Sequence, residues 1–93
     1  MLSQFPIDLN KVSEDNLDKE ILRLAMIAEL DAVNFYEQLA AKTKNKNIKK
    51  LMLDVAKEEK THVGEFQALL LKLDVEQINE LEEGKKEVEE LIR

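Results

Sequence analysis

The stretch VAKEEKTHVGEF, residues 55–66, decides the fold of this chain. It places Glu59 and His62 three residues apart in an apolar stripe that advances by alternating steps of four and three residues, as one face of a helix does. The stripe consists of Ile48, Met52, Val55, Glu59, His62, Phe66, Leu69 and Leu73. A carboxylate and an imidazole on a buried stripe are unfavourable unless they pair or bind a metal. Since the i, i+3 spacing directs both side chains to one spot, Glu-x-x-His is a candidate half of a metal site.

The composition predicts one small all-helical domain. The chain has 93 residues, of which 37% are charged and 44% hydrophobic, with two glycines and one proline. Domains of this size often gain stability by oligomerising. The net charge of −6 and the lack of a basic cluster argue against nucleic acid and anionic membranes as partners. Because there is no cysteine, carboxylates and the single histidine must hold any metal.

The predicted elements are an N-terminal arm and three helices. Residues 1–12 carry apolar side chains without a period and are expected to be extended. A first helix is predicted over 13–44 with Ser13 as its N-cap, and a second over 48–73 with Asn47 as its N-cap. A third helix is predicted over 75–92, and the capping-box-like pair Asp74 and Gln77 starts it. Whether Gly84 interrupts this helix is left open by the sequence. No apolar run approaches the roughly 20 residues of a membrane span and no secretory signal is visible, so we expect a cytoplasmic protein.

The first predicted helix carries two apolar stripes. One consists of Leu17, Ile21, Leu24, Ala28, Ala32, Phe35 and Leu39, and the other of Leu22, Met26, Glu29, Val33, Tyr36 and Ala40. A helix with two apolar faces needs two partners. Because the chain supplies only one other long helix, the remaining partner is expected to be a second copy, which gives a homodimer and a four-helix bundle.

Glu29 is predicted to face Glu59 and His62 when the two long helices pack side by side. Ferritin-like di-iron proteins combine a Glu from each of two helices with a Glu-x-x-His from each of the other two. Two copies of this chain related by a two-fold axis would supply that set. Carboxylate and imidazole ligands suit iron or manganese, and zinc is a third candidate for the bound metal. Tyr36 is either a hydrogen-bonding neighbour of the metals or a core tyrosine.

The segments AMIAELDAVNFYEQLA (25–40) and LDVAKEEKTHVGEFQALLLKLDVEQ (53–77) resemble the encapsulated ferritins, ferritin-like proteins housed in encapsulin nanocompartments. The resemblance implies a two-helix ferritin-like subunit, a four-helix bundle in the dimer and a ring-shaped decamer. It also implies a ferroxidase that oxidises Fe(II) with O2 at a di-iron site shared by two subunits, inside an encapsulin shell that stores the product. The ligands of the family fall on Glu29, Glu59 and His62 and its tyrosine on Tyr36, while Asp31 matches one acid of a metal-entry site.

Two alternatives remain open on the residues alone. Glu59 and His62 could form a buried polar pair that sets the register of a non-enzymatic helical interaction module. Alternatively, the di-metal site could reduce peroxide or hold manganese, although the absence of cysteine weighs against a rubrerythrin-like peroxidase with a cysteine-ligated iron domain. No shell-docking peptide is visible after Ile92, so we expect either a truncated chain or a natural fusion to the shell protein.

Overall fold

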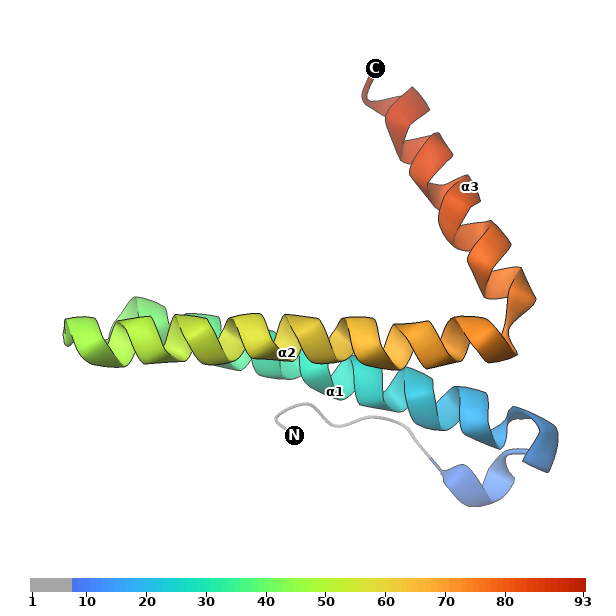
Figure 1. Cartoon of the computed structure of the whole chain (residues 1–93), viewed down its shortest axis with the longest axis horizontal. Coiled ribbons are helices and arrows are strands. Elements are labelled where there is room, and N and C mark those ends of the chain that lie inside the picture. The colour runs from blue at the N-terminus through green and yellow to red at the C-terminus, as the bar shows by residue number, and fades with distance from the viewer. Residues whose placement is uncertain (1–7) are drawn as a thin grey trace.

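The computed structural model describes residues 8–93, and these residues form three α-helices and one short 3-10 helix without any strand. The helix α1 spans Glu14–Lys42, α2 spans Lys46–Leu73 and α3 spans Val75–Leu91. Figure 1 shows α1 and α2 lying against each other as a long antiparallel hairpin, with α3 leaving the open end of the hairpin at a steep angle. The all-α prediction of a helical hairpin followed by a third helix is therefore confirmed.

The predicted N-terminal arm is wrong where the structure describes it. Residues 1–7 of the arm lie outside the described residues, but Leu9–Lys11 form a 3-10 helix instead of extended chain. Its N-cap is Asp8, whose side chain accepts a hydrogen bond from the backbone N–H of Asn10 at 3.0 Å. Ser13 is the N-cap residue of α1 by position, but its side chain makes no capping hydrogen bond.

The hairpin turn lies two residues earlier than predicted and has the same length of three residues, 43–45. The first helix ends at Lys42 and the second begins at Lys46, because Asn45 rather than Asn47 is the N-cap. The Asn45 side chain accepts hydrogen bonds from the backbone N–H groups of Asn47 at 2.9 Å and Ile48 at 3.1 Å. Two otherwise unpaired donors of the first turn are thereby satisfied. The loop of three residues joins α1 directly to α2, so the two helices are neighbours in the hairpin.

A single residue, Asp74, joins α2 to α3. It is the C-cap of α2 and the N-cap of α3, and its carboxylate accepts a hydrogen bond from the backbone N–H of Gln77 at 3.1 Å, as the capping pair predicts. The same carboxylate forms an ion pair with Arg23 of α1 at 2.9 Å. The hydrogen bond from Gln77 holds the pKa of Asp74 below its usual value, partial burial opposes this, and the charges of Arg23 and Lys19 lower it further. One side chain thus anchors the base of α3 to the hairpin.

The third helix, for which the sequence left a break at Gly84 open, is not broken there. The helix α3 runs without interruption through Gly84, whose backbone has a negative φ. An isolated glycine lowers helix stability by about 1 kcal/mol relative to alanine. That penalty is too small to end a helix that is capped at Asp74 and continues in good helix formers on both sides.

The buried core of the described chain is thin. Its only buried hydrophobic side chains are Val33, Ala40, Ala56 and Leu70. Val33 and Ala40 belong to the α1 stripe that includes Glu29, so this stripe faces α2. The other α1 stripe is left partly open, and its members Ile21 and Leu39 are exposed.

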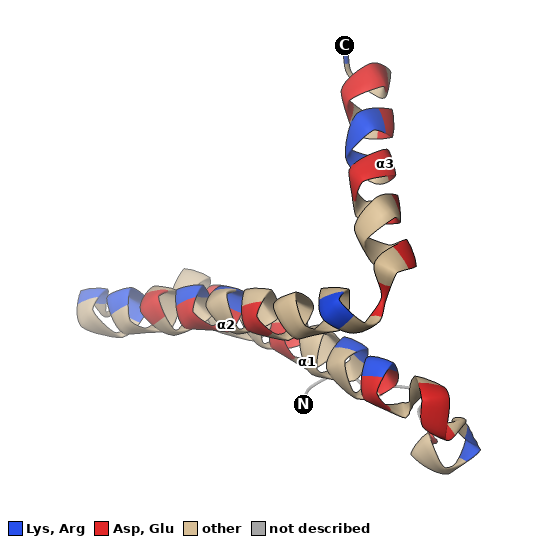
Figure 2. Ribbon diagram, turned by 45° about the vertical axis from the view of Figure 1, so that its right-hand side comes forward, with Lys and Arg blue, Asp and Glu red and all other residues tan. Residues whose placement is uncertain are grey.

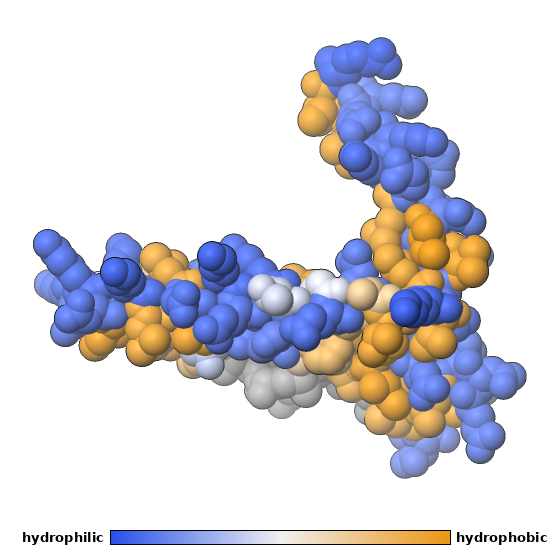
Figure 3. Space-filling view, in the orientation of Figure 1, coloured by the Kyte–Doolittle hydropathy of each residue, from blue (hydrophilic) through white to orange (hydrophobic). Residues whose placement is uncertain are grey.

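The stripe of α2 that contains Glu59 and His62 is not the face that packs most deeply on α1. Ala56 and Leu70 make that contact, whereas Ile48, Leu69 and Leu73 of the predicted stripe are exposed. Figure 3 shows hydrophobic side chains gathered at the joint between the hairpin and α3 and along the hairpin edge. One hairpin therefore leaves much apolar surface in water. Within residues 8–93, no helix combines the length and hydrophobicity needed to cross a membrane.

Candidate metal centre

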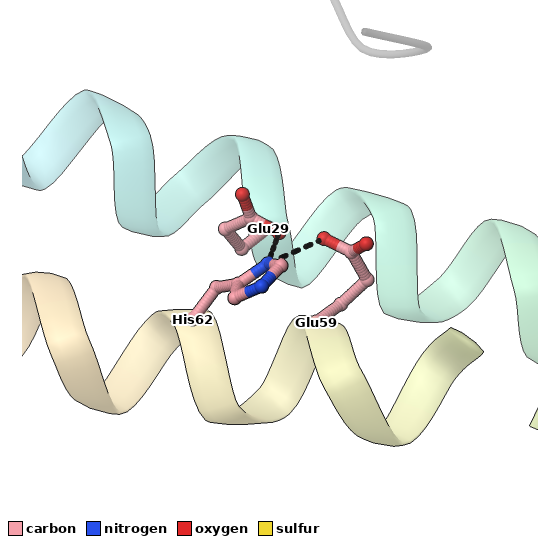
Figure 4. A group of neighbouring side chains, drawn as sticks. All are labelled: Glu29, Glu59 and His62. Carbon is pink, nitrogen blue, oxygen red and sulfur yellow. Dashed lines mark hydrogen bonds and ion pairs between the residues drawn. The ribbon is translucent and has the colours of Figure 1, made fainter. Parts of the chain in front are cut away.

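Three side chains from the two long helices converge at the middle of the hairpin (Figure 4). Nδ1 of His62 lies 3.4 Å from Oε2 of Glu29 and 3.5 Å from Oε2 of Glu59. One potential ligand atom from each residue lies within 4.8 Å of the other two. Glu29 comes from α1, while Glu59 and His62 come from α2. The three residues that the sequence analysis predicts to face one another therefore converge in the structure.

Regular helical geometry alone directs these side chains. Glu29 precedes the buried Val33 by four residues, so both lie on the face of α1 that meets α2. Glu59 follows the buried Ala56 by three residues, and His62 lies one turn further on the same side of α2. Because no loop residue takes part, the donor positions are as rigid as the two helices.

The cluster is only partly covered by its own chain. The side chains of Glu59 and Glu29 are 18% and 21% exposed, whereas that of His62 is 43% exposed. The sequence predicts that Glu59 and His62 are buried between two copies, and one hairpin by itself covers only one side of the cluster. The imidazole therefore faces the open side of the hairpin, where further ligands can approach.

Tyr36 and Asp31 lie beside this cluster. Both line a hollow of about 320 Å³, together with Glu29 and Glu59. The Tyr36 ring packs edge-on against Phe35 with a centroid distance of 5.1 Å. Tyr36 is thus partly exposed, packs against Phe35 and borders the carboxylates. Asp31 shares the hollow without being one of the three residues whose ligand atoms cluster.

Two polar features were missed by the sequence analysis. The ion pair between Arg23 and Asp74 joins residues 51 positions apart, and no local sequence pattern predicts such a contact. The second is a basic surface at the hairpin turn, visible at the end of α2 in Figure 2, which corrects the statement that the chain lacks a basic cluster. It consists of Lys42, Lys44, Lys46, Lys49 and Lys50.

Comparison with known proteins assigns the chain to a family. The model of the rubrerythrin family matches residues 20–92, which include all three clustered residues. The chain belongs to the rubrerythrin family. The crystal structure of the encapsulated ferritin domain from Pyrococcus furiosus aligns with this chain at a TM-score of 0.83 and 55% identity, covering 98% of this chain and 95% of that one. The ferritin-like fold and the resemblance to the encapsulated ferritins are therefore confirmed.

Two curated relatives of this rubrerythrin-family chain are longer proteins. The ferritin-like-encapsulin shell fusion protein of Pyrococcus furiosus is 64% identical over 72 residues, which are 77% of this chain and 21% of that protein. The encapsulin nanocompartment cargo protein EncC of Myxococcus xanthus is 37% identical over 67 residues, 72% of this chain and 51% of that protein. The chain thus spans about a fifth of the first relative and about half of the second.

Proposed function

We propose that this chain is a ferroxidase that oxidises Fe(II) to Fe(III) with O2 at a di-iron site shared by two copies. The observation that carries the proposal is the convergence of Glu29, Glu59 and His62, with ligand atoms within 4.8 Å of one another. Two carboxylates and one imidazole without sulfur are donors that suit iron. Membership of the rubrerythrin family supports iron oxidoreductase chemistry.

The site of one chain is half of the ferritin-like set, so the proposal requires a second copy. A two-fold axis beside the cluster would bring two of each residue together, giving four carboxylates and two imidazoles. Two observations support this arrangement. The side chain of His62 is exposed to solvent in one chain, and so are Ile21 and Leu39 on the open stripe of α1. In the complete site, the carboxylates of Glu29 and Glu59 and the imidazole of His62 from both copies would hold the two irons, with Glu59 of each copy shared between them.

The remaining residues of the hollow have subsidiary roles in this proposal. Two Fe(II) ions would deliver two electrons to one O2, which with two protons gives H2O2, and the Fe(III) product would leave for storage elsewhere. The Tyr36 hydroxyl, at the edge of the hollow that Glu29 and Glu59 line, is a hydrogen-bond donor near the metals. Asp31, in the same hollow, attracts incoming Fe(II) by its charge.

The names of the relatives support a setting for this activity. One relative is a fusion to an encapsulin shell and the other is an encapsulin cargo protein. We therefore propose that the chain acts inside an encapsulin nanocompartment in the cytoplasm, with the shell protein as partner. The resemblance to the encapsulated ferritins further suggests that dimers assemble into a ring-shaped decamer, and that the iron mineral collects in the shell.

Native mass spectrometry with anaerobic Fe(II) titration tests the shared site directly. We expect an assembly with an even number of chains that takes up two irons per pair. A Glu59→Gln chain should lose this uptake, whereas the matched Glu58→Gln chain, altered at an exposed position on the same helix, should keep it. Dimers that take up no iron would overturn the ferroxidase proposal and favour an interaction module.

A second assay separates the ferroxidase from the di-metal peroxidase. The iron-loaded protein is mixed in stopped flow with either O2 or H2O2, and the formation of Fe(III) is followed. Faster oxidation by O2 than by an equal concentration of H2O2 is expected for a ferroxidase. The reverse order would assign the site to peroxide reduction.

A further inference from the structure

Four lysines lie on one side of α2, and we call this surface the lysine face: Lys46, Lys49, Lys50 and Lys57. At 100° per residue they occupy an arc of about 100° around the helix axis, and at 1.5 Å per residue they extend over about 17 Å along it. All four are exposed. None forms an ion pair within residues 8–93, the part of the chain that the structure describes. The lysine face is therefore a row of uncompensated positive charges.

Three of these lysines stand where a helix disfavours positive charge. Lys46, Lys49 and Lys50 belong to the first five residues of α2, at the end where the backbone N–H groups create a positive potential. The first turn of α2 contains no acid, whereas α1 and α3 both have acids in their first turns. These lysines therefore oppose the helix that carries them. A local feature that works against the fold is typical of a functional site.

The lysine face points away from the metal cluster. At 100° per residue, Glu59 and His62 lie on the opposite side of α2, so a second copy that covers the cluster leaves the lysine face in water. The neighbouring Lys60 differs from the four, since its ammonium group pairs with Glu37 of α1 at 3.4 Å. Lys60 thus ties the two long helices together, while the lysine face is available to a ligand.

The chemistry of the lysine face suits a chain of phosphates. Lysine ammonium groups bind phosphate oxygens as point charges, and a bound anion would offset the repulsion at the start of α2. The side chains would make these contacts, because the carboxamide of Asn45 already accepts hydrogen bonds from two N–H groups of the first turn. A single ion covers only part of a row about 17 Å long, whereas a linear chain of phosphates can compensate all four charges.

Two observations argue against nucleic acid as the ligand. Residues 46–57 contain no arginine and no aromatic residue on which a base could stack. The chain as a whole carries a net charge of −6, which repels a long polyanion beyond the lysine face. We propose that the lysine face binds linear inorganic polyphosphate.

Isothermal titration calorimetry of the full-length, metal-free chain with long-chain sodium polyphosphate tests this proposal. The variant with Lys46→Gln, Lys49→Gln and Lys50→Gln should bind at least about tenfold more weakly, because fewer phosphates are neutralised. Glutamine is as good a helix former as lysine, so α2 is kept. The affinity of the unchanged chain should fall as salt is added, and that of the variant should fall less steeply.

A second triple variant is the matched control. Lys72→Gln, Lys85→Gln and Lys86→Gln remove the same charge at exposed positions outside the lysine face, and this chain should bind polyphosphate within about twofold of the unchanged protein. Equal weakening in the two variants, or no binding by the unchanged chain, would overturn the proposal.

Three comparison ligands define what the lysine face recognises. Orthophosphate at the same total phosphate concentration should bind more weakly than polyphosphate, because it cannot span the row of lysines. Single-stranded DNA and polyglutamate of matched charge should also bind more weakly. Orthophosphate binding of equal strength would indicate an adventitious ion only. Equal or tighter binding of DNA or polyglutamate would assign the surface to nucleic acid or to an acidic protein segment, and either result would overturn the proposal.

Thermal unfolding gives a second measurement. Without polyphosphate, the Lys46, Lys49 and Lys50 variant should melt at the same temperature as the unchanged chain or higher, since it places no positive charge at the start of α2. Polyphosphate should raise the melting temperature of the unchanged chain more than that of the variant. A variant that melts lower without polyphosphate would give these lysines a structural role and overturn the proposal.

Polyphosphate binding does not rest on the proposed ferroxidase activity. Glu59→Gln, which should lose iron uptake, should bind polyphosphate like the unchanged chain, because Glu59 lies on the other side of α2. The Lys46, Lys49 and Lys50 variant should keep its Fe(II) uptake. The failure of one proposal can therefore be told apart from the failure of the other. Loss of polyphosphate binding in Glu59→Gln would contradict its assignment to the lysine face.

Discussion

At the scale of single residues, the exposure of His62 bears on what the Glu59–His62 pair does. A buried pair that only fixes helix register should be enclosed and hydrogen-bonded. Here the imidazole is 43% exposed while both neighbouring carboxylates are more covered. An open imidazole beside two half-buried carboxylates is better suited to receiving a ligand than to filling a core.

Replacing His62 with leucine distinguishes the two functions. The ferroxidase should lose oxidation rate by about 100-fold or more, since a direct ligand matters at least as much as its supporting partners. The free energy of unfolding should stay the same or rise by about 1 kcal/mol, because leucine continues the apolar stripe. Stopped-flow iron oxidation and chemical denaturation measure the two effects. Loss of dimerisation with unchanged oxidation would contradict this prediction.

Replacing Tyr36 with phenylalanine isolates its hydroxyl. The ring contact with Phe35 should survive, so the free energy of unfolding should change by no more than about 0.5 kcal/mol. Fe(II) binding should be retained, while oxidation slows about tenfold through loss of a hydrogen bond near the metals. Anaerobic titration and oxidation kinetics on one preparation separate these effects. An unchanged rate would leave Tyr36 as a core residue only.

At the scale of elements, the joint at Asp74 decides how α3 leaves the hairpin. Local capping by Asp74 starts α3, whereas the ion pair with Arg23 connects its base to α1. The only substantial contact of α3 in the described chain besides this joint is with the end of α2. The direction of α3 therefore depends on few interactions.

The lowered pKa of Asp74 predicts a pH-dependent contribution to stability. Since the folded pKa of Asp74 lies below its unfolded value of 3.8, the contribution is fully present above that value. It is lost as the pH falls through the folded pKa. Asp74→Asn keeps a good N-cap but removes the charge. The difference in melting temperature between the two chains should be constant near neutral pH and shrink in acid. A difference that grows on acidification would contradict the assignment.

Replacing Gly84 with alanine tests the continuity of α3. A Cβ at this position would meet nothing within 4 Å, and the backbone φ is negative. Alanine should therefore stabilise the helix by about 0.5–1 kcal/mol. Gly64→Ala in α2, where space is equally open, is a matched comparison. Circular dichroism during thermal unfolding measures both. Destabilisation at Gly84 alone would indicate a bend there.

At the scale of the whole molecule, the thin core makes association part of stability. The described chain buries only four hydrophobic side chains and exposes many large ones. A domain of this size rarely stabilises itself with so small a core. The free energy of unfolding should therefore rise with protein concentration.

Polar substitutions on the open α1 stripe should weaken the proposed dimer. Ile21→Ser and Leu39→Ser remove apolar surface that is already exposed in one chain, so the effect on a monomer should be small. Each should reduce association by about 1.5–3 kcal/mol if the side chain is buried between copies. Leu30→Ser, on the opposite side of α1, is the control. Analytical ultracentrifugation measures the change, and equal effects at all three positions would contradict the proposed face.

The sequence by itself determined the elements and most of the candidate site. Helical periodicity and the i, i+3 spacing act within a few residues, so the two long helices and the pairing of Glu59 with His62 could be predicted. Only the tertiary structure decided which face of α2 packs on α1 and which distant residues meet, such as Arg23 and Asp74, whose ion pair joins positions 51 residues apart. These features depend on contacts between distant segments. Such contacts arise from packing, which no local pattern encodes.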